Sequence, residues 1–267
     1  MGMSLFCTAS NTIAVRSMNS VPQPLTSASD TPNPAVPCCD RCALAQACEG
    51  RQLDLEHRLE LHAMMRSLGP FKPGAFVFRQ GAPFDSITAV HSGTVKTYVI
   101  DPDGREQVLG FFLPGEMLGL DAIHSGHYPC HAVALDTVTL CSAPFPALSA
   151  LARRERSLQA RLFCLLSHDI RKASALVGDH TAEERVAAFL WALWQHQAEI
   201  NPAHARLDLA MSRTDIANYL RLASETVSRI FQRLQQLGII QVSRRRVELR
   251  DLARLEALAT ATLRPSS

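Results

Sequence analysis

Between residues 70 and 146, short apolar runs alternate with glycines, and this pattern limits the fold more than any other feature of the chain. Four of the runs lie at residues 75–80, 86–93, 94–100 and 106–113. Turn residues separate them at intervals of about ten, which is typical of short antiparallel strands. The pattern predicts a small antiparallel barrel, β-roll or sandwich.

The apolar spacing then changes to a helical period. From about Arg154, residues recur at steps of three and four: Phe163, Leu166, Ile170, Ala173 and Val177. Such a seam favours pairing with a helix of a second subunit, although one wide core face would show the same spacing. A second stripe, Leu158, Leu162 and Leu165, can pack on the chain's own barrel. We expect a dimerisation helix over residues 151–178.

A second domain is expected after this helix. Gly178 is a suitable helix end, and "TAEE" at 181–184 has the Thr-x-x-Glu spacing of a capping box that starts the next helix. A chain of 267 residues with 47% hydrophobic content can bury two modest cores. Residues 179–267 are therefore predicted to form a separate C-terminal domain.

Residues 211–240 have the layout of a helix-turn-helix. Ser212 can cap a short helix, "RLA" can make a tight turn, and Ser224 can cap a second helix that Gly238 ends. The residues expected to face inward on the second helix are Val227, Ile230, Leu234 and Leu237. An ordinary helical hairpin with a solvated charged face is the alternative.

The second helix carries a polar triplet, Glu225, Ser228 and Arg229, at i, i+3 and i+4, so all three project from one face. Arg can bond guanine O6 and N7 together, Glu can accept from cytosine N4, and Ser is adaptable. "IIQVSRRRVELRD" reads as two strands joined at 243–245, a basic wing for phosphates. Further DNA contacts are expected from Arg213, Arg244 and Arg245.

The charge distribution agrees with a polyanionic partner. Residues 211–250 contain eight arginines and three acidic residues, whereas the whole chain has a net charge of only +2. No window approaches the run of about 18 apolar residues that spans a bilayer, and the N-terminus lacks signal-peptide features. We therefore expect a cytoplasmic chain that does not contact membranes.

Four cysteines lie close together in "CCDRCALAQACEG", residues 38–50, after a Ser-, Thr-, Asn- and Pro-rich segment, 1–37, that reads as a disordered tail. In a reducing compartment such a group is better suited to metal binding or redox sensing than to disulfides. Spacing alone leaves Cys38 and Cys39 as alternatives for the first ligand. It also leaves Cys130 and Cys141 as alternatives for a remote one.

These segments together resemble the FNR branch of the CRP/FNR family of bacterial transcription regulators, from about Cys39 to Ala257. The residues that carry the resemblance are "CDRCALAQAC", "HSGTVKTY", "LPGEMLGLDAI", "SGHYP", "AEERVAAFL" and "RTDIANYLRLASETVSRIFQRLQ". The resemblance implies an α+β protein with an antiparallel β-roll sensor domain at 38–150, a long dimerisation helix and a C-terminal winged helix-turn-helix. It implies a homodimeric activator, not an enzyme, that works with RNA polymerase.

The resemblance also implies a cofactor. In the family, cysteines spaced C-x2-C-x5-C and one distant cysteine hold an oxygen-labile 4Fe-4S cluster, which promotes dimerisation and DNA binding under anaerobic conditions. Cys39, Cys42 and Cys48 reproduce the spacing, and "TLCSAPF" selects Cys141 as the fourth ligand. A zinc- or thiol-redox-dependent regulator without the cluster is the alternative. The cysteines expected to be dispensable are Cys7, Cys38, Cys130 and Cys164, the last as a buried apolar residue.

For DNA, the resemblance implies palindromes of the type TTGAT-N4-ATCAA. Arg229 would contact the guanine, Glu225 the cytosine paired to it, and Ser228 a thymine. Cyclic nucleotide binding is not expected, because Glu116 is kept but "HSGHYPCHAVA" has no arginine to neutralise a phosphate. Three residues are expected to be loop histidines without a second ligand set: His124, His127 and His131.

One residue departs from the FNR pattern. The family commonly carries an acidic residue where this chain has Ala173, and repulsion between two such charges keeps the cluster-free protein monomeric. Ala173 removes that repulsion. Asp169, next to Ile170, could supply part of it from the edge of the seam. We expect the cluster-free protein to dimerise more readily than a typical FNR.

Overall fold

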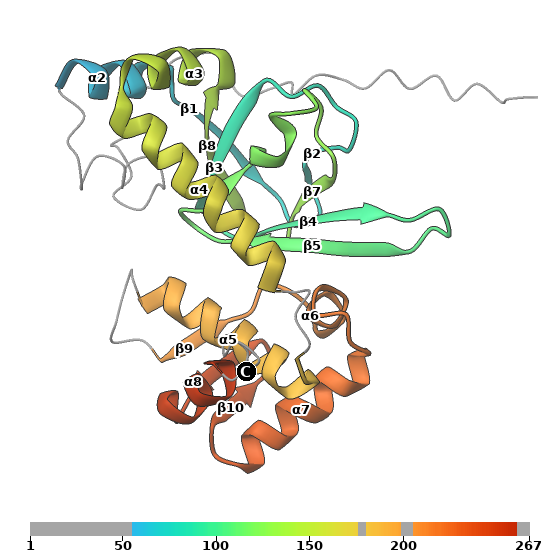
Figure 1. Cartoon of the computed structure of the whole chain (residues 1–267). Helices are drawn as coiled ribbons and strands as arrows, with labels where there is room; N and C mark the ends of the chain where they lie inside the picture. The colour runs from blue at the N-terminus through green and yellow to red at the C-terminus, as the bar shows by residue number, and fades with distance from the viewer. Residues whose placement is uncertain (1–54, 176–179, 199–204, 261–267) are drawn as a thin grey trace, which may run out of the picture.

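The computed structural model describes residues 55–175, 180–198 and 205–260, and Figure 1 shows a β-rich body and a helix-rich body joined through one long helix. The expected tail, residues 1–37, and every cysteine before residue 50 lie outside the described residues. Val177 and Gly178 also lie outside them. Within the described ranges, no helix is both long and apolar enough to cross a bilayer.

The β-rich body consists of two four-stranded antiparallel sheets, which confirms the predicted β-roll. One sheet has the order β1 (Arg66–Phe71), β8 (Val138–Pro144), β3 (Ser86–Ser92) and β6 (Met117–Leu118). The other has the order β2 (Phe76–Phe78), β7 (His131–Ala134), β4 (Val95–Ile100) and β5 (Glu106–Phe112). The four predicted runs are β2, β3, β4 and β5. A shared core fills the space between the sheets and includes Val90, Val95, Ala132 and Leu140.

Helices cover the outer face of the β1-β8-β3-β6 sheet. These are α2 (Leu55–Met64), α3 (Phe145–Arg154) and the first half of α4 (Arg156–Ala175), with a short 3-10 helix η1 (Leu120–Ala122) nearby. Leu158 is fully buried in this layer with Ile87 and Ala89 of β3, and Leu162 and Leu165 pack beside it. The second stripe therefore packs on the chain's own β-roll, as predicted.

The long helix starts later than the spacing suggested. Residues 151–154 belong to α3, and Glu155 has an extended backbone (φ −112°, ψ 104°) that separates α3 from α4. Of the predicted seam residues, Leu166 packs against the same layer as Leu158, whereas Phe163 and Ile170 are 62% and 67% exposed. Cys164 is also exposed, so its expected burial is wrong. One step along a helix turns a side chain by about 100°, which takes Cys164 off the face that Leu165 buries.

In the described residues after 179, the helix-rich body contains three strands and four helices. They are α5 (Ala182–Ala198), β9 (Arg206–Asp208), α6 (Arg213–Tyr219), α7 (Ser224–Gln236), β10 (Ile240–Ser243), β11 (Arg246–Leu249) and α8 (Leu252–Thr260). The predicted capping box of α5 is present, because Thr181 N donates to Glu184 Oε2 (2.8 Å) and Glu184 N donates to Thr181 Oγ1 (3.3 Å). The wing strands are confirmed, and β9 adds a third strand beside β11.

Candidate nucleic-acid interface

The N-terminus of α6 and the turn after it hold the two helices of the predicted motif in place. Ser212 Oγ accepts from Asp215 N (3.0 Å), and the Asp215 carboxylate accepts from Ser212 N (3.0 Å), so Ser212 caps α6 as predicted. In the turn, Arg221 adopts a left-handed backbone (φ 57°), and Leu222 N donates to Ala217 O (2.9 Å). This tight turn lets α7 follow α6 after only a few residues.

Two expectations for α7 are wrong. Ala223, with an extended backbone (φ −70°, ψ 144°), is the N-cap, so Ser224 is already the first helical residue and does not cap it. Leu237 is the C-cap residue of a helix that ends at Gln236, and it is 41% exposed; Phe231, which was not among the residues expected to face inward, is buried. The other inward residues are buried as predicted: Val227, Ile230 and Leu234.

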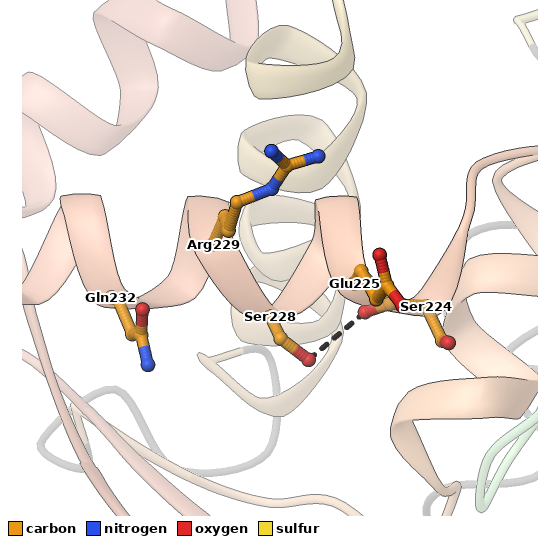
Figure 2. Close-up of a pocket in the computed structure, with 5 residues that line it drawn as sticks. All are labelled: Ser224, Glu225, Ser228, Arg229 and Gln232. Carbon is orange, nitrogen blue, oxygen red and sulfur yellow. Dashed lines mark hydrogen bonds between the residues drawn. The ribbon is translucent and has the colours of Figure 1, made fainter.

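The outer face of α7 carries the predicted triplet. Glu225, Ser228 and Arg229 are all exposed. Together with Ser224 and Gln232 they line one pocket, and Figure 2 shows the Arg229 side chain extending in a different direction from Ser228 and Gln232. Ser228 Oγ donates to Ser224 O (2.9 Å), which fixes the hydroxyl close to the helix. The face thus offers a cation, an anion and a small hydroxyl within two turns.

Gln232 was missed by the sequence reasoning. It lies one turn beyond Ser228 and seven residues beyond Glu225, so the helical period already placed it on the same face. Its amide carries both a donor and an acceptor, and Gln can pair with adenine N6 and N7. The polar face is therefore one turn longer than the predicted triplet.

The predicted basic residues occupy two different places. Arg244 and Arg245 are exposed in the turn between β10 and β11. Arg213 lies on α6 with its guanidinium carbon 3.6 Å from the centroid of the Phe231 ring, and burial lowers its pKa. A guanidinium stacked in this way packs α6 against α7 while it stays partly exposed. Arg213 is thus held against α7 by its contact with Phe231.

The two candidates for a remote thiol ligand, Cys141 and Cys130, lie on opposite sides of the β1-β8-β3-β6 sheet. Cys141 pairs with Ser67 of β1 and with Ala89 of β3. Because directly paired residues of antiparallel strands share a face, Cys141 points toward the layer that contains Ala89 and Leu61 of α2. Cys130 lies instead in the core between the sheets and is 1% exposed.

The environment of Cys130 opposes its ionisation. Its Sγ lies 3.9 Å from Asp121 Oδ2, and burial together with this carboxylate raises the pKa of the thiol to about 12. A thiolate, the form that binds metals, is therefore disfavoured there. Within the described ranges, no group of three or more His, Cys, Asp or Glu residues is placed so that it could hold a metal ion. His124 and His127 are exposed in the loop, whereas His131 is the first residue of β7 and not a loop residue.

Glu116 is fully engaged within the chain. Its Oε2 accepts from Leu113 N (2.7 Å), and its Oε1 accepts from Lys172 Nζ (3.0 Å), which comes from α4. Both carboxylate oxygens thus have partners before any ligand binds.

Comparisons with known proteins match both bodies. The family model of the cyclic nucleotide-binding domain matches residues 69–155, and that of the Crp-like helix-turn-helix domain matches residues 184–258. The chain is 40% identical to the transcriptional activator protein Anr of Pseudomonas aeruginosa over 228 residues, 84% of this chain and 93% of that protein. It is 35% identical to the fumarate and nitrate reduction regulatory protein of Escherichia coli, covering 84% of this chain and 91% of that protein.

Solved structures agree with the sequence matches. The structure of FixK2 from Bradyrhizobium japonicum superposes with a TM-score of 0.64 at 27% identity, over 76% of this chain and 98% of that chain.

Proposed function

The chain belongs to the Crp/Fnr family of transcription regulators, and from that premise we propose that it is an oxygen-responsive activator that binds palindromic DNA as a homodimer. Because the relatives in this family are transcription regulators, the chain is a DNA-binding regulator and not an enzyme. The exposed face of Glu225, Ser228, Arg229 and Gln232 on α7 is the observation that carries the DNA-binding part of the proposal.

The exposed seam of α4 supports a homodimer. Phe163 and Ile170 lie seven residues apart on one face of α4, and both are mostly exposed in the single chain. Apolar side chains at this spacing are stabilised by a second copy of the helix. Two copies of α7 in such a dimer would enter successive major grooves about 34 Å apart, which suits a palindrome of the TTGAT-N4-ATCAA type.

The position of Cys141 supports the proposed cofactor. Its thiol faces the layer of α2, and α2 begins seven residues after Cys48. Cys39, Cys42, Cys48 and Cys141 would hold the cluster, since four thiolates are the donor set that a 4Fe-4S cluster requires. When bound, the cluster would supply an oxygen-labile link between the cysteine segment and β8. At Cys130, burial and the Asp121 carboxylate raise the pKa of the thiol, which disfavours the thiolate that this role needs.

A contact at the start of α4 offers a route from the cysteine segment to the seam. Glu155 Oε1 accepts from Ser157 N (2.9 Å) and so caps the first turn of α4. Glu155 Oε2 lies 3.5 Å from His57 Nδ1, and His57 belongs to α2. A displacement of α2 would therefore act directly on the first turn of the seam helix, as a change in the population of dimer-competent chains.

The chain is proposed to respond without a cyclic nucleotide. Glu116, which the family's nucleotide-binding members use for the ribose, already binds Leu113 N and Lys172 Nζ. The neighbouring segment 124–134 has no arginine to neutralise a phosphate. RNA polymerase is the proposed protein partner, and the cytoplasm is the proposed location.

An absorption spectrum of the protein purified without oxygen tests the cofactor. Iron-sulfur charge transfer gives a broad visible band, whereas zinc thiolate is colourless. We expect the band, and we expect it to fade in air. A colourless protein that contains zinc would favour a zinc-dependent regulator of the same family and overturn the oxygen-sensing proposal.

The helix and the wing are expected to contribute differently to DNA binding. Arg229→Ala should lose about 1 to 3 kcal/mol of discrimination at the guanine, since one bidentate contact to a base disappears. Arg245→Ala should weaken binding to all sequences alike and reduce the slope of log K against log salt by about one unit. Titrations of matched and single-mismatch duplexes at several salt concentrations measure both. Equal loss of specificity in the two variants would contradict this division.

A further inference from the structure

The helix-turn-helix is docked on an edge strand of the sensor domain. β5 is the last strand of its sheet, so one side of its backbone is left without a partner strand. Asn218 of α6 occupies that side: its Oδ1 accepts from Val108 N (2.7 Å), and its Nδ2 donates to Glu106 O (2.6 Å). Figure 1 shows α6 beneath the β4–β5 hairpin. One side-chain amide thus replaces the peptide group of a neighbouring strand.

A buried charge completes the same contact. Lys96 of β4 is 8% exposed, and its Nζ lies 2.6 Å from Glu106 Oε1 and 2.8 Å from Asp215 Oδ1. Burial acts to lower the pKa of Lys96, but Asp215 and Glu106 outweigh it and the net pKa is raised. Asp215 is also the residue that completes the cap of α6. The Lys96 ammonium group therefore holds the N-terminal end of α6, where the helix-turn-helix begins.

Apolar packing makes the contact continuous with a core. Phe111 of β5 meets Phe189 of α5 and Tyr219 of α6, with ring centroids 6.0 Å and 5.3 Å away. Val108 and Phe111 belong to the same buried cluster as Val227 and Leu234 of α7. The position of α7 is thus set through α6 by the sensor domain.

From these contacts we infer that Asn218, Lys96 and Asp215 are positioning residues that fix each recognition helix relative to the seam helix and so select the spacer between half-sites. The inference rests on the proposed homodimer on a palindrome. Each base pair added to a spacer moves one half-site by about 3.4 Å and rotates it by about 35°. A dimer whose two recognition helices are held rigidly should bind a palindrome with one spacer length tightly. It should bind palindromes whose spacers are one base pair longer or shorter much more weakly.

The test uses the full-length, cluster-loaded protein and palindromes whose spacers differ by one base pair at a time, with a single half-site as reference. Asn218→Ala and Lys96→Met are compared with the wild type and with Lys72→Met, a matched change at an exposed lysine. The wild type and Lys72→Met should prefer one spacer strongly. Each test variant should bind that spacer about tenfold more weakly, because fixed hydrogen bonds are lost, and should lose most of its preference.

The half-site reference separates positioning from folding. Affinity for a single half-site should stay at the wild-type value in Asn218→Ala, the milder variant, because α7 itself is unchanged. Loss of half-site affinity equal to the loss on the palindrome would overturn the inference, and so would a variant that keeps the full spacer preference. A wild type that binds palindrome and half-site equally well would refute the proposed dimer, and the inference with it.

Discussion

Cys141→Ser is expected to abolish cluster binding and, with it, tight binding to the palindrome, whereas Cys130→Ser should leave both intact. Cys141 faces the layer of α2, which follows the cysteine segment, while Cys130 is enclosed between the two sheets beside Asp121. Serine keeps the size of the side chain but removes the thiolate that the cluster requires. The two variants are therefore matched, since both replace a buried thiol of the same body.

Iron and sulfide content after anaerobic reconstitution, together with DNA binding of the same samples, measures the outcome. Single serine variants of Cys39, Cys42 and Cys48 should behave like Cys141→Ser. Those of Cys7, Cys38 and Cys164 should behave like the wild type. Thermal unfolding of the iron-free proteins serves as the control for folding. Iron lost from Cys130→Ser and retained by Cys141→Ser would show that the fourth ligand is assigned to the wrong strand.

Ala173→Asp is expected to make dimerisation strictly dependent on the cluster. Ala173 is exposed on the same helix as the exposed seam residues Phe163 and Ile170. Two aspartates that meet across the seam would repel each other by on the order of a few kcal/mol at an effective dielectric constant of about 20. The wild type lacks this repulsion and should form cluster-free dimers more readily, so oxygen should silence it less completely.

Asp169 is expected to supply only part of the missing repulsion, from the edge of the seam. Burial has the largest effect on its carboxyl group and raises its pKa, whereas Lys172 and His168 of α4 act to lower it. A half-buried carboxyl group beside these cations should repel a second copy less than an aspartate at position 173.

Sedimentation of aerobic, iron-free protein at micromolar concentration tests the role of Ala173. We expect a measurable dimer fraction in the wild type and a monomer in Ala173→Asp, with His168→Asp, at an exposed position on another face of α4, as the control. If the wild type and Ala173→Asp were both monomeric, the seam charge would have no effect on dimerisation here.

Local patterns were enough to predict the elements that form from local interactions. Glycine-separated apolar runs predicted β2 to β5, and the Ser212 and Thr181 caps are where the spacing placed them. Capping residues, turn residues and helical spacing also predicted the helix-turn-helix, its wing and its polar face. The DNA-contacting and cluster-binding roles of the named residues stay predictions.

Contacts between distant segments could not be predicted in this way. Lys96 and Asp215 are 119 residues apart, and nothing in "TVKTYVI" distinguishes a lysine that will be buried from one that will be exposed. The predictions of both ends of α7 were wrong for a related reason. The backbone of Ala223 and the exposure of Leu237 depend on how α7 packs against the rest of the domain. Cys164 was misplaced because apolar neighbours in the sequence do not determine which face of a helix is buried.

The most direct test of the account is DNA binding by one preparation before and after exposure to air. Protein loaded with the cluster under anaerobic conditions is titrated into a fluorescent TTGAT-N4-ATCAA duplex, and the titration is repeated after oxygen is admitted and again after anaerobic reconstitution. We expect tight binding, then a large loss of affinity as the visible absorption fades, then recovery. Affinity that is unchanged by air while the cluster is lost would contradict the claim that this chain couples oxygen to DNA binding.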